Sequence, residues 1–187
     1  MQRILFAILL IVTISVSACT GNDSGAEQKA AGKTISVAKK AEWIGFDAGL
    51  AKAAKEKKNM IVDFYTDWCH WCKVMDEKTF SDAKVNQKLL DQFVTVRINA
   101  ENPNQSAAFR GKTYSNVELT RAFGVNGFPS LAFLDDAGEI ITIVPGYVPP
   151  ETFIYILDYI DQGCYKKQMS FEEFMKKKGE CDDKTKT

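Results

Sequence analysis

The sequence predicts an α/β fold in which helices flank a central mixed β-sheet. Three apolar runs carry this prediction, because each has the β-branched and aromatic content of a buried strand. These runs are Met60–Tyr65, Phe93–Ile98 and Leu131–Leu134. The turn Asp135–Gly138 leads into a further strand, Glu139–Val144. Helical patterns complete the order β-α-β-α-β-β-α, which is typical of a mixed sheet covered by helices.

The helices are predicted from apolar spacing and from capping residues. Ahead of the first strand, apolar residues repeat at helical spacing at Phe46, Leu50, Ala53 and Ala54. Ser81-Asp82 can cap the helix that precedes Phe93. Ser115-x-x-Glu118 is a capping box that opens a short helix. Pro150 suits the first turn of the last helix of the sheet domain.

Three segments near these elements have weaker patterns. Thr34–Val37 is expected to form a short edge strand. Trp43 is expected to pack the first helix against the domain rather than to contact a substrate. Glu101–Tyr114 has no apolar periodicity and is long for a connection. We expect a plain surface insertion there, and a substrate-facing loop is the alternative.

The chemistry of the chain is concentrated where the first strand ends. The strand breaks into the polar pair Thr66-Asp67, and two cysteines, Cys69 and Cys72, follow with two residues between them. A helix-compatible segment begins at Lys73. A Cys-x-x-Cys pair at a strand-to-helix junction places the first sulfur over the helix N-terminus, where free N–H groups and the helix dipole stabilise a thiolate. This arrangement indicates redox chemistry.

These residues also resemble a known family. Ile61–Lys73 is similar to the active-site segment of thioredoxin-fold oxidoreductases, with Trp68 before the first cysteine. Asp63 stands six positions before Cys69, where those enzymes carry a buried carboxylate. The longer run Trp68–Asn99 most resembles the periplasmic C-terminal domain of DsbD and related thioredoxin-like lipoproteins. The resemblance covers Ala41 to Ile160 and implies a thioredoxin fold.

A second motif, Phe128-Pro129, supports the resemblance. A proline directly before a core strand cannot donate a hydrogen bond to the sheet, so its presence needs a reason. In thioredoxin-like proteins this position holds a cis-proline beside the cysteine pair, and the residue before it offers backbone groups to an extended substrate. The resemblance therefore implies a cis Pro129 and a substrate-binding Phe128. A simple turn proline is the alternative.

The resemblance also implies the roles of the site residues. Cys69 is expected to attack a substrate disulfide, and Cys72, expected to be the more buried of the two, resolves the mixed disulfide. Asp63 would accept the proton of Cys72. The alternative for Asp63 is a strand carboxylate paired with a lysine such as Lys73.

The residues around the cysteines are candidates for substrate binding. Trp68 precedes the pair, and His70 and Trp71 lie within it. A positive His70 would favour a thiolate and make the pair more oxidising. The protein disulfide isomerase pattern has histidine next to the second cysteine, where this chain has Trp71, so its redox potential does not carry over.

Other chemistries have little support. One Cys-x-x-Cys and a single histidine supply too few ligands for a closed zinc site. Lys73 stands where haem attachment needs a histidine. We therefore expect no metal and no cofactor. Lys plus Arg and Asp plus Glu number 24 each, without a basic block, so nucleic acid is not an expected partner.

The N-terminus is predicted to export the chain. Residues 1–18 have a positive Arg3 and a short apolar run, and Val16–Cys19 resembles a lipobox in which Cys19 becomes lipidated. An ordinary signal peptide and an uncleaved anchor are the alternatives. Residues 19–33 are expected to be a flexible tether, and residues 34–162 the thioredoxin-like domain. A lipobox, an ordinary signal peptide and an uncleaved anchor would each deliver the domain to a compartment where disulfides persist.

Residues 163–187 are predicted to form a C-terminal extension. Ser170-x-x-Glu173 opens a short basic helix, Phe171–Lys178, and Cys164 and Cys181 bracket it. Of the five cysteines, lipidation of Cys19 would leave an even set. We expect a structural disulfide between Cys164 and Cys181, worth ~3 kcal/mol. A second redox pair that relays electrons is the alternative.

Taken with the resemblance, these features predict an envelope-facing, lipid-anchored thiol–disulfide oxidoreductase. The most similar family implies a reductant of protein disulfides that draws electrons from a membrane transporter of the DsbD type. An oxidant or isomerase is the first alternative. A thioredoxin-fold binding module whose cysteines are only structural is the second.

Overall fold

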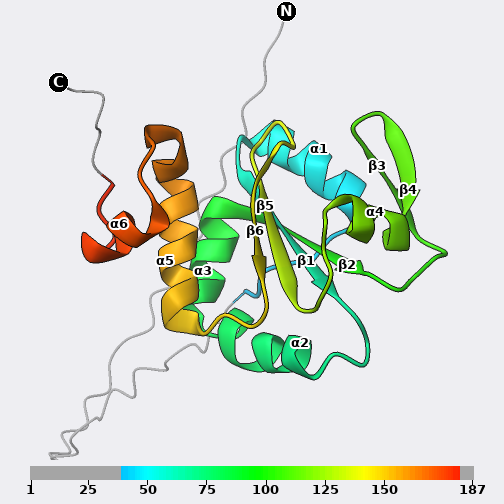
Figure 1. Ribbon diagram of the computed structural model, residues 1–187, viewed down its shortest axis with the longest axis horizontal. Helices are drawn as coiled ribbons and strands as arrows, with labels where there is room; N and C mark the ends of the chain where they lie inside the picture. The colour runs from blue at the N-terminus through cyan, green and yellow to red at the C-terminus, as the bar shows by residue number, and fades with distance from the viewer. Residues whose placement is uncertain (1–38, 182–187) are drawn as a thin grey trace, which may run out of the picture. The chain divides into compact units, whose positions relative to one another are not determined.

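The central sheet contains four strands in the order β2-β1-β5-β6 (Figure 1). In this computed structural model, which describes residues 39–181, β1 (Asn59–Tyr65) runs parallel to β2 (Phe93–Asn99). It pairs antiparallel with β5 (Ser130–Leu134), which pairs antiparallel with β6 (Ile140–Pro145). The predicted mixed sheet is confirmed. The predicted strand Thr34–Val37 lies outside the described residues.

Helices cover both faces of this sheet. The helices of the sheet domain are α1 (Phe46–Glu56), α2 (His70–Met75), α3 (Ala83–Gln92), α4 (Asn116–Ala122) and α5 (Pro150–Asp161). A π-helical turn, η1 (Asp76–Phe80), continues α2. Figure 1 shows α1 and α4 on one side of the sheet and α3 and α5 on the other.

Alternate residues of β1 enter two separate cores. Val62 and Phe64 pack with residues of α1 and α4, whereas Ile61 packs with residues of α2, α3 and α5. Since side chains alternate along a strand, Asp63 lies on the same face as Ile61. The buried carboxylate is thereby placed on the face of the sheet that α2 covers.

The predicted caps are confirmed. Asp82 accepts hydrogen bonds from the backbone N–H groups of Lys84 and Val85, over 2.9 and 3.0 Å, and so starts α3. Ser115 opens α4 with a complete capping box. Pro150 occupies the first turn of α5. Each of these residues satisfies or removes a backbone donor that the first turn of a helix leaves free.

The segment Glu101–Tyr114, expected as a plain surface insertion, contains a β-hairpin that the sequence analysis did not predict. Its strands are β3 (Ser106–Phe109) and β4 (Lys112–Ser115), joined by Arg110 and Gly111 with φ of 51° and 75°. Ala107 and Phe109 are buried in the core under α1 and α4. Only β3 alternates, with two buried side chains, and no residue of β4 is buried, so the pattern is too short to stand out in the sequence.

The C-terminal extension packs on α5. It consists of a 3₁₀ turn, η2 (Cys164–Lys167), and α6 (Phe171–Lys176), which is shorter than predicted and opens with the expected Ser170 capping box. Phe174 is buried against Tyr155 and Tyr159 of α5. A disulfide joins Cys164 to Cys181, with Cα atoms 5.7 Å apart. Within residues 39–181 no helix has the length and apolar character needed to cross a bilayer.

Candidate active site

The Cys-x-x-Cys pair lies where the sequence predicts it, at the junction between β1 and α2. Cys69 and Cys72 form a disulfide with Cα atoms 5.3 Å apart. Cys69 is the N-cap of α2, and its Sγ accepts a hydrogen bond from the backbone N–H of Cys72 over 3.0 Å. The first sulfur therefore occupies the place where a capping oxygen usually stands, and the helix dipole favours negative charge on it.

The expectation that Cys72 is the more buried cysteine is wrong for this oxidised form. Both residues are 4% exposed. Their difference is positional, because Cys69 precedes the helix and Cys72 lies in its first turn, facing the core.

The second predicted motif lies beside the pair. The Phe128–Pro129 peptide bond is cis, as predicted. The ring of Phe128 lies 6.4 Å from that of Trp68, the residue before Cys69. Gly146, at the end of β6, donates its N–H to the carbonyl of Pro129 over 2.8 Å. Two segments about 60 residues apart in the chain thus meet near the disulfide, because β5 pairs antiparallel with β1 and begins where β1 ends.

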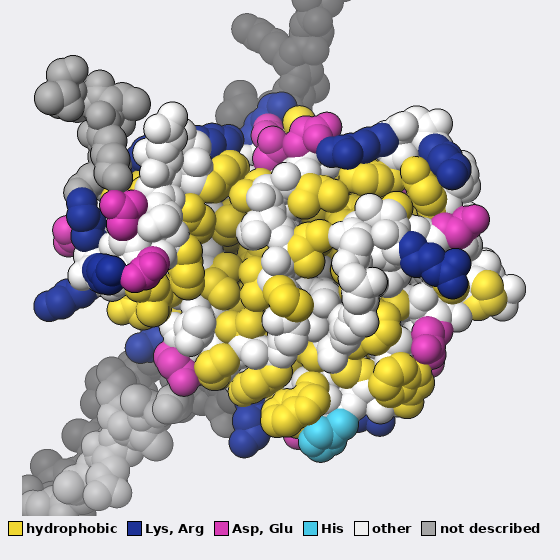
Figure 2. Space-filling view, viewed as in Figure 1, with side chains coloured by type: hydrophobic (Ala, Val, Ile, Leu, Met, Phe, Trp, Pro, Cys, Tyr) yellow, Lys and Arg dark blue, Asp and Glu magenta, His cyan; other side chains and the backbone are white. Residues whose placement is uncertain are grey.

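Exposed aromatic side chains surround the disulfide. Trp68 is 67% exposed and Trp71 is 54% exposed, which is unusual for tryptophan. Trp71 lies 5.6 Å from the ring of His70 and 5.5 Å from that of Tyr147. Figure 2 shows hydrophobic side chains on both sides of the single histidine. We call Trp68, His70, Trp71, Phe128 and Tyr147 the aromatic rim.

Two residues near the disulfide, Tyr147 and Glu101, were not predicted from the sequence. Tyr147 gives no signal beyond its place after Gly146. Glu101 opens the Glu101–Tyr114 segment, and its Oε2 accepts a hydrogen bond from Nε1 of Trp68 over 2.8 Å. The segment therefore does reach the neighbourhood of the cysteine pair, through its first residue.

Asp63 is buried and its partner is Arg97, not Lys73. Both Nε and Nη2 of Arg97 donate to Oδ2 of Asp63, over 2.9 and 2.7 Å. The two residues lie side by side in the parallel register of β1 and β2. Lys73 is exposed on α2. The alternative that paired Asp63 with a lysine is corrected to an arginine from the neighbouring strand.

Burial dominates the ionisation of Asp63. It raises the pKa of this carboxyl to about 6, although the charge and hydrogen bonds of Arg97 oppose the rise and Asp76 adds to it. A carboxyl with a pKa near neutral is suited to accept and return a proton at physiological pH. A buried group with a strongly shifted pKa, on the face of the sheet covered by the helix that carries the disulfide, is the kind of residue that marks a functional site.

Arg97 was also not predicted as a site residue, and its contact with Trp43 explains where that ring packs. The guanidinium lies 4.8 Å from the centre of the Trp43 ring, which in turn lies 4.8 Å from the ring of Phe80. Trp43 thus packs within the domain rather than facing a substrate, but against β2 and η1 and not, as predicted, against the first helix. A signal for Arg97 existed, because it is the one charged residue inside the alternating run Phe93–Ile98.

The geometry defines a class of protein. A disulfide lies at the N-terminus of a helix, a cis-proline lies beside it, a buried carboxylate lies on the face of the sheet that this helix covers, and exposed aromatic rings lie around it. These are the parts needed for exchange between a protein's own disulfide and a thiol of another molecule. The fold and the site together define a thioredoxin-fold thiol:disulfide oxidoreductase. Among residues 39–181, no group of three or more His, Cys, Asp or Glu is arranged to hold a metal ion.

Comparison with known proteins agrees with this class. Residues 46–161 match the model of the Thioredoxin-like domain, and the chain belongs to this family. It is 32% identical over 155 residues to the thiol:disulfide interchange protein DsbD of Yersinia pestis, and 32% identical over 109 residues to that of Actinobacillus pleuropneumoniae. These matches cover 82% and 57% of this chain. The chain spans only 24% and 17% of those relatives.

Solved structures show the same fold. A thioredoxin-fold protein from Helicobacter pylori superposes with a TM-score of 0.56 at 21% identity, covering 65% of this chain and 80% of that one. A thioredoxin from Thermus thermophilus superposes with a TM-score of 0.53 at 24% identity, covering 65% and 88%. The predicted thioredoxin fold is therefore confirmed.

Proposed function

We propose that this protein reduces protein disulfides at the bacterial cell envelope, with electrons from a membrane transporter of the DsbD type. The observation that carries the proposal is the Cys69–Cys72 disulfide at the start of α2, beside the cis Phe128–Pro129 bond. The match to DsbD, at 32% identity over 82% of this chain and 24% of that protein, supports it. A reductase of this kind cycles between the disulfide seen here and a dithiol.

The dithiol form would act in two steps. The Cys69 thiolate attacks one sulfur of a substrate disulfide, so a mixed disulfide forms and one substrate thiolate leaves. Cys72 then loses its proton to Asp63 and attacks Sγ of Cys69. The Cys69–Cys72 bond forms, the second substrate sulfur leaves as a thiolate, and two electrons have passed to the substrate. Cys69 is the attacking residue because it caps the helix, where a thiolate is stabilised.

The substrate would bind across the aromatic rim. Phe128 and Pro129 would offer backbone groups to an extended substrate segment, as strand-like recognition requires. Trp68, His70 and Trp71 would contact the side chains that flank the substrate disulfide. Exposed aromatic rings give a large contact area with little loss of side-chain freedom, which suits a site that accepts several protein partners.

The direction of electron flow is tested by the redox potential. Thioredoxin-like reductases have potentials of ~−270 mV and a strong oxidant has ~−120 mV. A positive His70 would stabilise the Cys69 thiolate and raise the potential, and we propose that this effect tunes the reductant rather than reversing it. We expect the reduced protein to reduce insulin and the pair to equilibrate with glutathione well below −120 mV. A potential near ~−120 mV, or no reduction of insulin, would assign the protein to the oxidants.

The membrane tether belongs to the same proposal. Residues 1–18, the lipid-acceptor Cys19 and the tether 19–33 lie outside the described residues. The lipobox-like Val16–Cys19 supports lipidation at Cys19 and a location facing the periplasm or the cell exterior. Metabolic labelling with a fatty acid should mark the wild-type protein and leave Cys19→Ser unlabelled. An unlabelled, soluble wild-type protein would contradict the tether.

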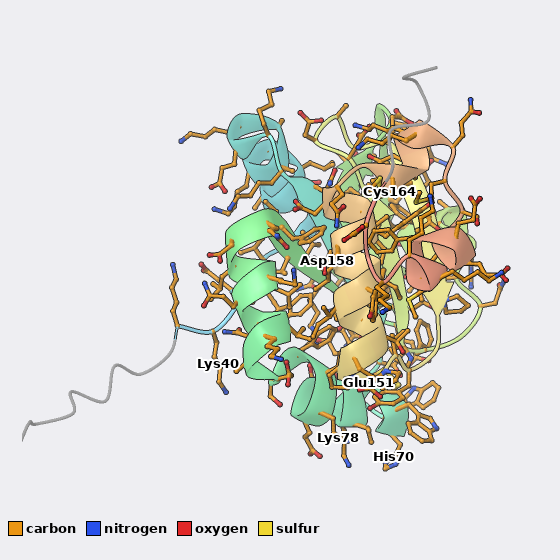
Figure 3. All side chains as sticks on the ribbon, turned by 90° about the vertical axis from the view of Figure 1, so that its left-hand side faces the viewer. Lys40, His70, Lys78, Glu151, Asp158 and Cys164 are labelled. Carbon is orange, nitrogen blue, oxygen red and sulfur yellow. A yellow bond between two sulfur atoms is a disulfide. The ribbon has the colours of Figure 1, made fainter. Side chains whose placement is uncertain are left out.

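The Cys164–Cys181 disulfide is proposed to be structural. Figure 3 shows Cys164 beyond one end of α5 and His70 beyond the other. A helix of 12 residues is about 18 Å long, so the two disulfides do not lie in contact along α5. Direct exchange requires contact between sulfurs. Electron relay between the pairs would therefore need another carrier.

A further inference from the structure

Three charged side chains form a cluster between the sheet and the helix that carries the disulfide. Asp63 comes from β1, Arg97 from β2 and Asp76 from η1. Arg97 bridges the two carboxylates, since its Nη2 donates to Oδ2 of Asp63 over 2.7 Å and also to Oδ1 of Asp76. The side chain of Asp63 is 2% exposed and that of Asp76 is 44% exposed. The cluster therefore runs from the interior to the surface.

The two oxygens of Asp63 have different surroundings. Oδ2 accepts both hydrogen bonds from Arg97. Oδ1 is buried and has no hydrogen-bond partner among residues 39–181. An unpaired buried acceptor costs about 1–3 kcal/mol, so such an atom needs an explanation. Exchange of a proton with the thiol of Cys72, a buried residue of the helix that covers this face of the sheet, would be one.

Arg97 is held in place by more than its ion pairs. Its guanidinium lies 4.8 Å from the ring centre of Trp43, 5.1 Å from that of Tyr65 and 5.8 Å from that of Phe80. Aromatic faces attract a cation and also restrict its movement. A guanidinium confined in this way keeps its two donors on Oδ2 of Asp63, and so determines which oxygen stays open.

We propose that Arg97 is a positioning residue that binds Oδ2 of Asp63 and presents Oδ1 as the oxygen that takes the proton of Cys72. The inference rests on the proposed function and concerns its second step. The S–H bond of Cys72 breaks and an O–H bond forms at Oδ1. The Cys72 thiolate then attacks Sγ of Cys69, and the substrate sulfur leaves with the electron pair of the broken mixed disulfide.

The cluster predicts that loss of Arg97 and loss of the Asp76 charge have opposite effects on the pKa of Asp63. The charged groups that face Asp63 are Arg97 from β2 and Asp76 from η1. The remaining charges of α2 and η1, on Lys73, Glu77 and Lys78, are exposed, and the β5 partner of Asp63 is the neutral Leu131. Arg97 lowers the pKa of Asp63 and Asp76 raises it. Loss of Arg97 should raise this pKa further, and loss of the Asp76 charge should lower it.

The test follows the resolving step alone. Reduced protein is mixed with one equivalent of 5,5′-dithiobis(2-nitrobenzoate) in a stopped-flow instrument. The first thionitrobenzoate reports attack by Cys69, and the second reports resolution by Cys72. The rate of the second release is measured across the pH range for wild type, Arg97→Gln, Arg97→Lys and Asp76→Asn. We expect the lower inflection to move up by about one pH unit in Arg97→Gln and to move down in Asp76→Asn.

The controls separate positioning from a merely structural role. Arg110→Gln removes an exposed arginine that pairs with Glu139 over 2.6 Å, and should leave the inflection unchanged. Arg97→Lys keeps the charge and should restore most of the wild-type profile. If Arg97→Gln does not fold, the downward shift in Asp76→Asn remains a test of the same cluster. A structural role would slow both releases at every pH and leave the inflection in place, which would overturn the proposal.

The same experiment distinguishes failure of the proposed function from failure of the role proposed for Arg97. Absence of the second release from the wild-type protein would mean that Cys72 does not resolve a mixed disulfide, and would contradict the function itself. The other outcome is a normal second release with the same inflection in wild type, Asp76→Asn and Arg97→Lys. If a folded Arg97→Gln also shows no upward shift, only the role of Arg97 is contradicted.

Discussion

Nε1 of Trp68 donates a hydrogen bond to Oε2 of Glu101 over 2.8 Å, and so ties the residue before the attacking cysteine to the segment that leads into the β3–β4 hairpin. Trp68 is otherwise 67% exposed and contacts Phe128 at a ring distance of 6.4 Å. The orientation of one of the two tryptophan rings in the aromatic rim thus depends on a carboxylate 33 residues further along the chain.

Glu101→Ala should therefore weaken substrate binding. An exposed hydrogen bond of this kind contributes about 0.5–1.5 kcal/mol, which corresponds to a rise in KM of about two- to tenfold. The value of kcat should change little, because Glu101 does not touch the sulfurs. Steady-state kinetics with a protein disulfide substrate would measure both, with Glu77→Ala as the control for loss of an exposed acid near the site. A fall in kcat with an unchanged KM would refute this reading.

The order of attack can be read from trapped intermediates. Cys72→Ser leaves Cys69 able to form a mixed disulfide that nothing resolves, so covalent complexes with substrates should accumulate. Cys69→Ser should accumulate none, since Cys72 lies in the first turn of α2 and does not cap it. Non-reducing electrophoresis of proteins from cells that express each variant would show the difference. Equal trapping by both variants would overturn the assignment of Cys69.

The stability of the fold should depend on pH through Asp63. Its pKa is about 6 in the folded protein and 3.8 in the ordinary carboxyl, so the folded state binds more protons between these values. The unfolding free energy of wild type relative to Asp63→Asn should then fall as pH rises through this window, by up to about 1.4 kcal/mol per pH unit. Urea denaturation of both proteins at several pH values measures this difference. A difference that is flat, or that grows with pH, would contradict the raised pKa.

The C-terminal disulfide should contribute stability without taking part in turnover. It joins residues separated by 17 positions, and closing a loop of that length is worth about 3 kcal/mol. The double variant Cys164→Ser/Cys181→Ser should lose about this amount of unfolding free energy and retain insulin reduction at a temperature where it is folded. Mass mapping under mild reductant should show Cys69–Cys72 opening first. Simultaneous opening, with loss of activity in the folded double variant, would favour the relay alternative.

Much of the fold was predictable because local signals and tertiary packing agree. Val62 and Phe64 alternate with Ile61 in a run that is apolar on both faces, which is how a strand buried between two layers of helices must look. Asp82 and Ser115 predict helix N-termini, because their side chains cap the first turn without any tertiary contact. The cis Phe128–Pro129 bond followed from resemblance rather than from propensity.

What could not be predicted depends on pairing between distant residues. Arg97 becomes the partner of Asp63 only through the parallel register of β1 and β2, and the sequence does not contain that register. Glu101 and Tyr147 join the site through loops whose course is set by the rest of the fold. The equal burial of Cys69 and Cys72 depends on how the surrounding elements pack around both residues, which their order in the chain does not reveal.

The position of β6 at the outside of the sheet has a consequence for the behaviour of the protein in concentrated solution. An outermost strand presents unpaired backbone groups on which another chain can build, and apolar side chains make such growth favourable. Ile141 and Val144 of β6 line one cavity together with Tyr165 and Phe171 of the C-terminal extension. Because the extension packs beside this strand and the Cys164–Cys181 bond ties its far end to the segment just after α5, we expect its removal to expose Ile141 and Val144 and to promote self-association.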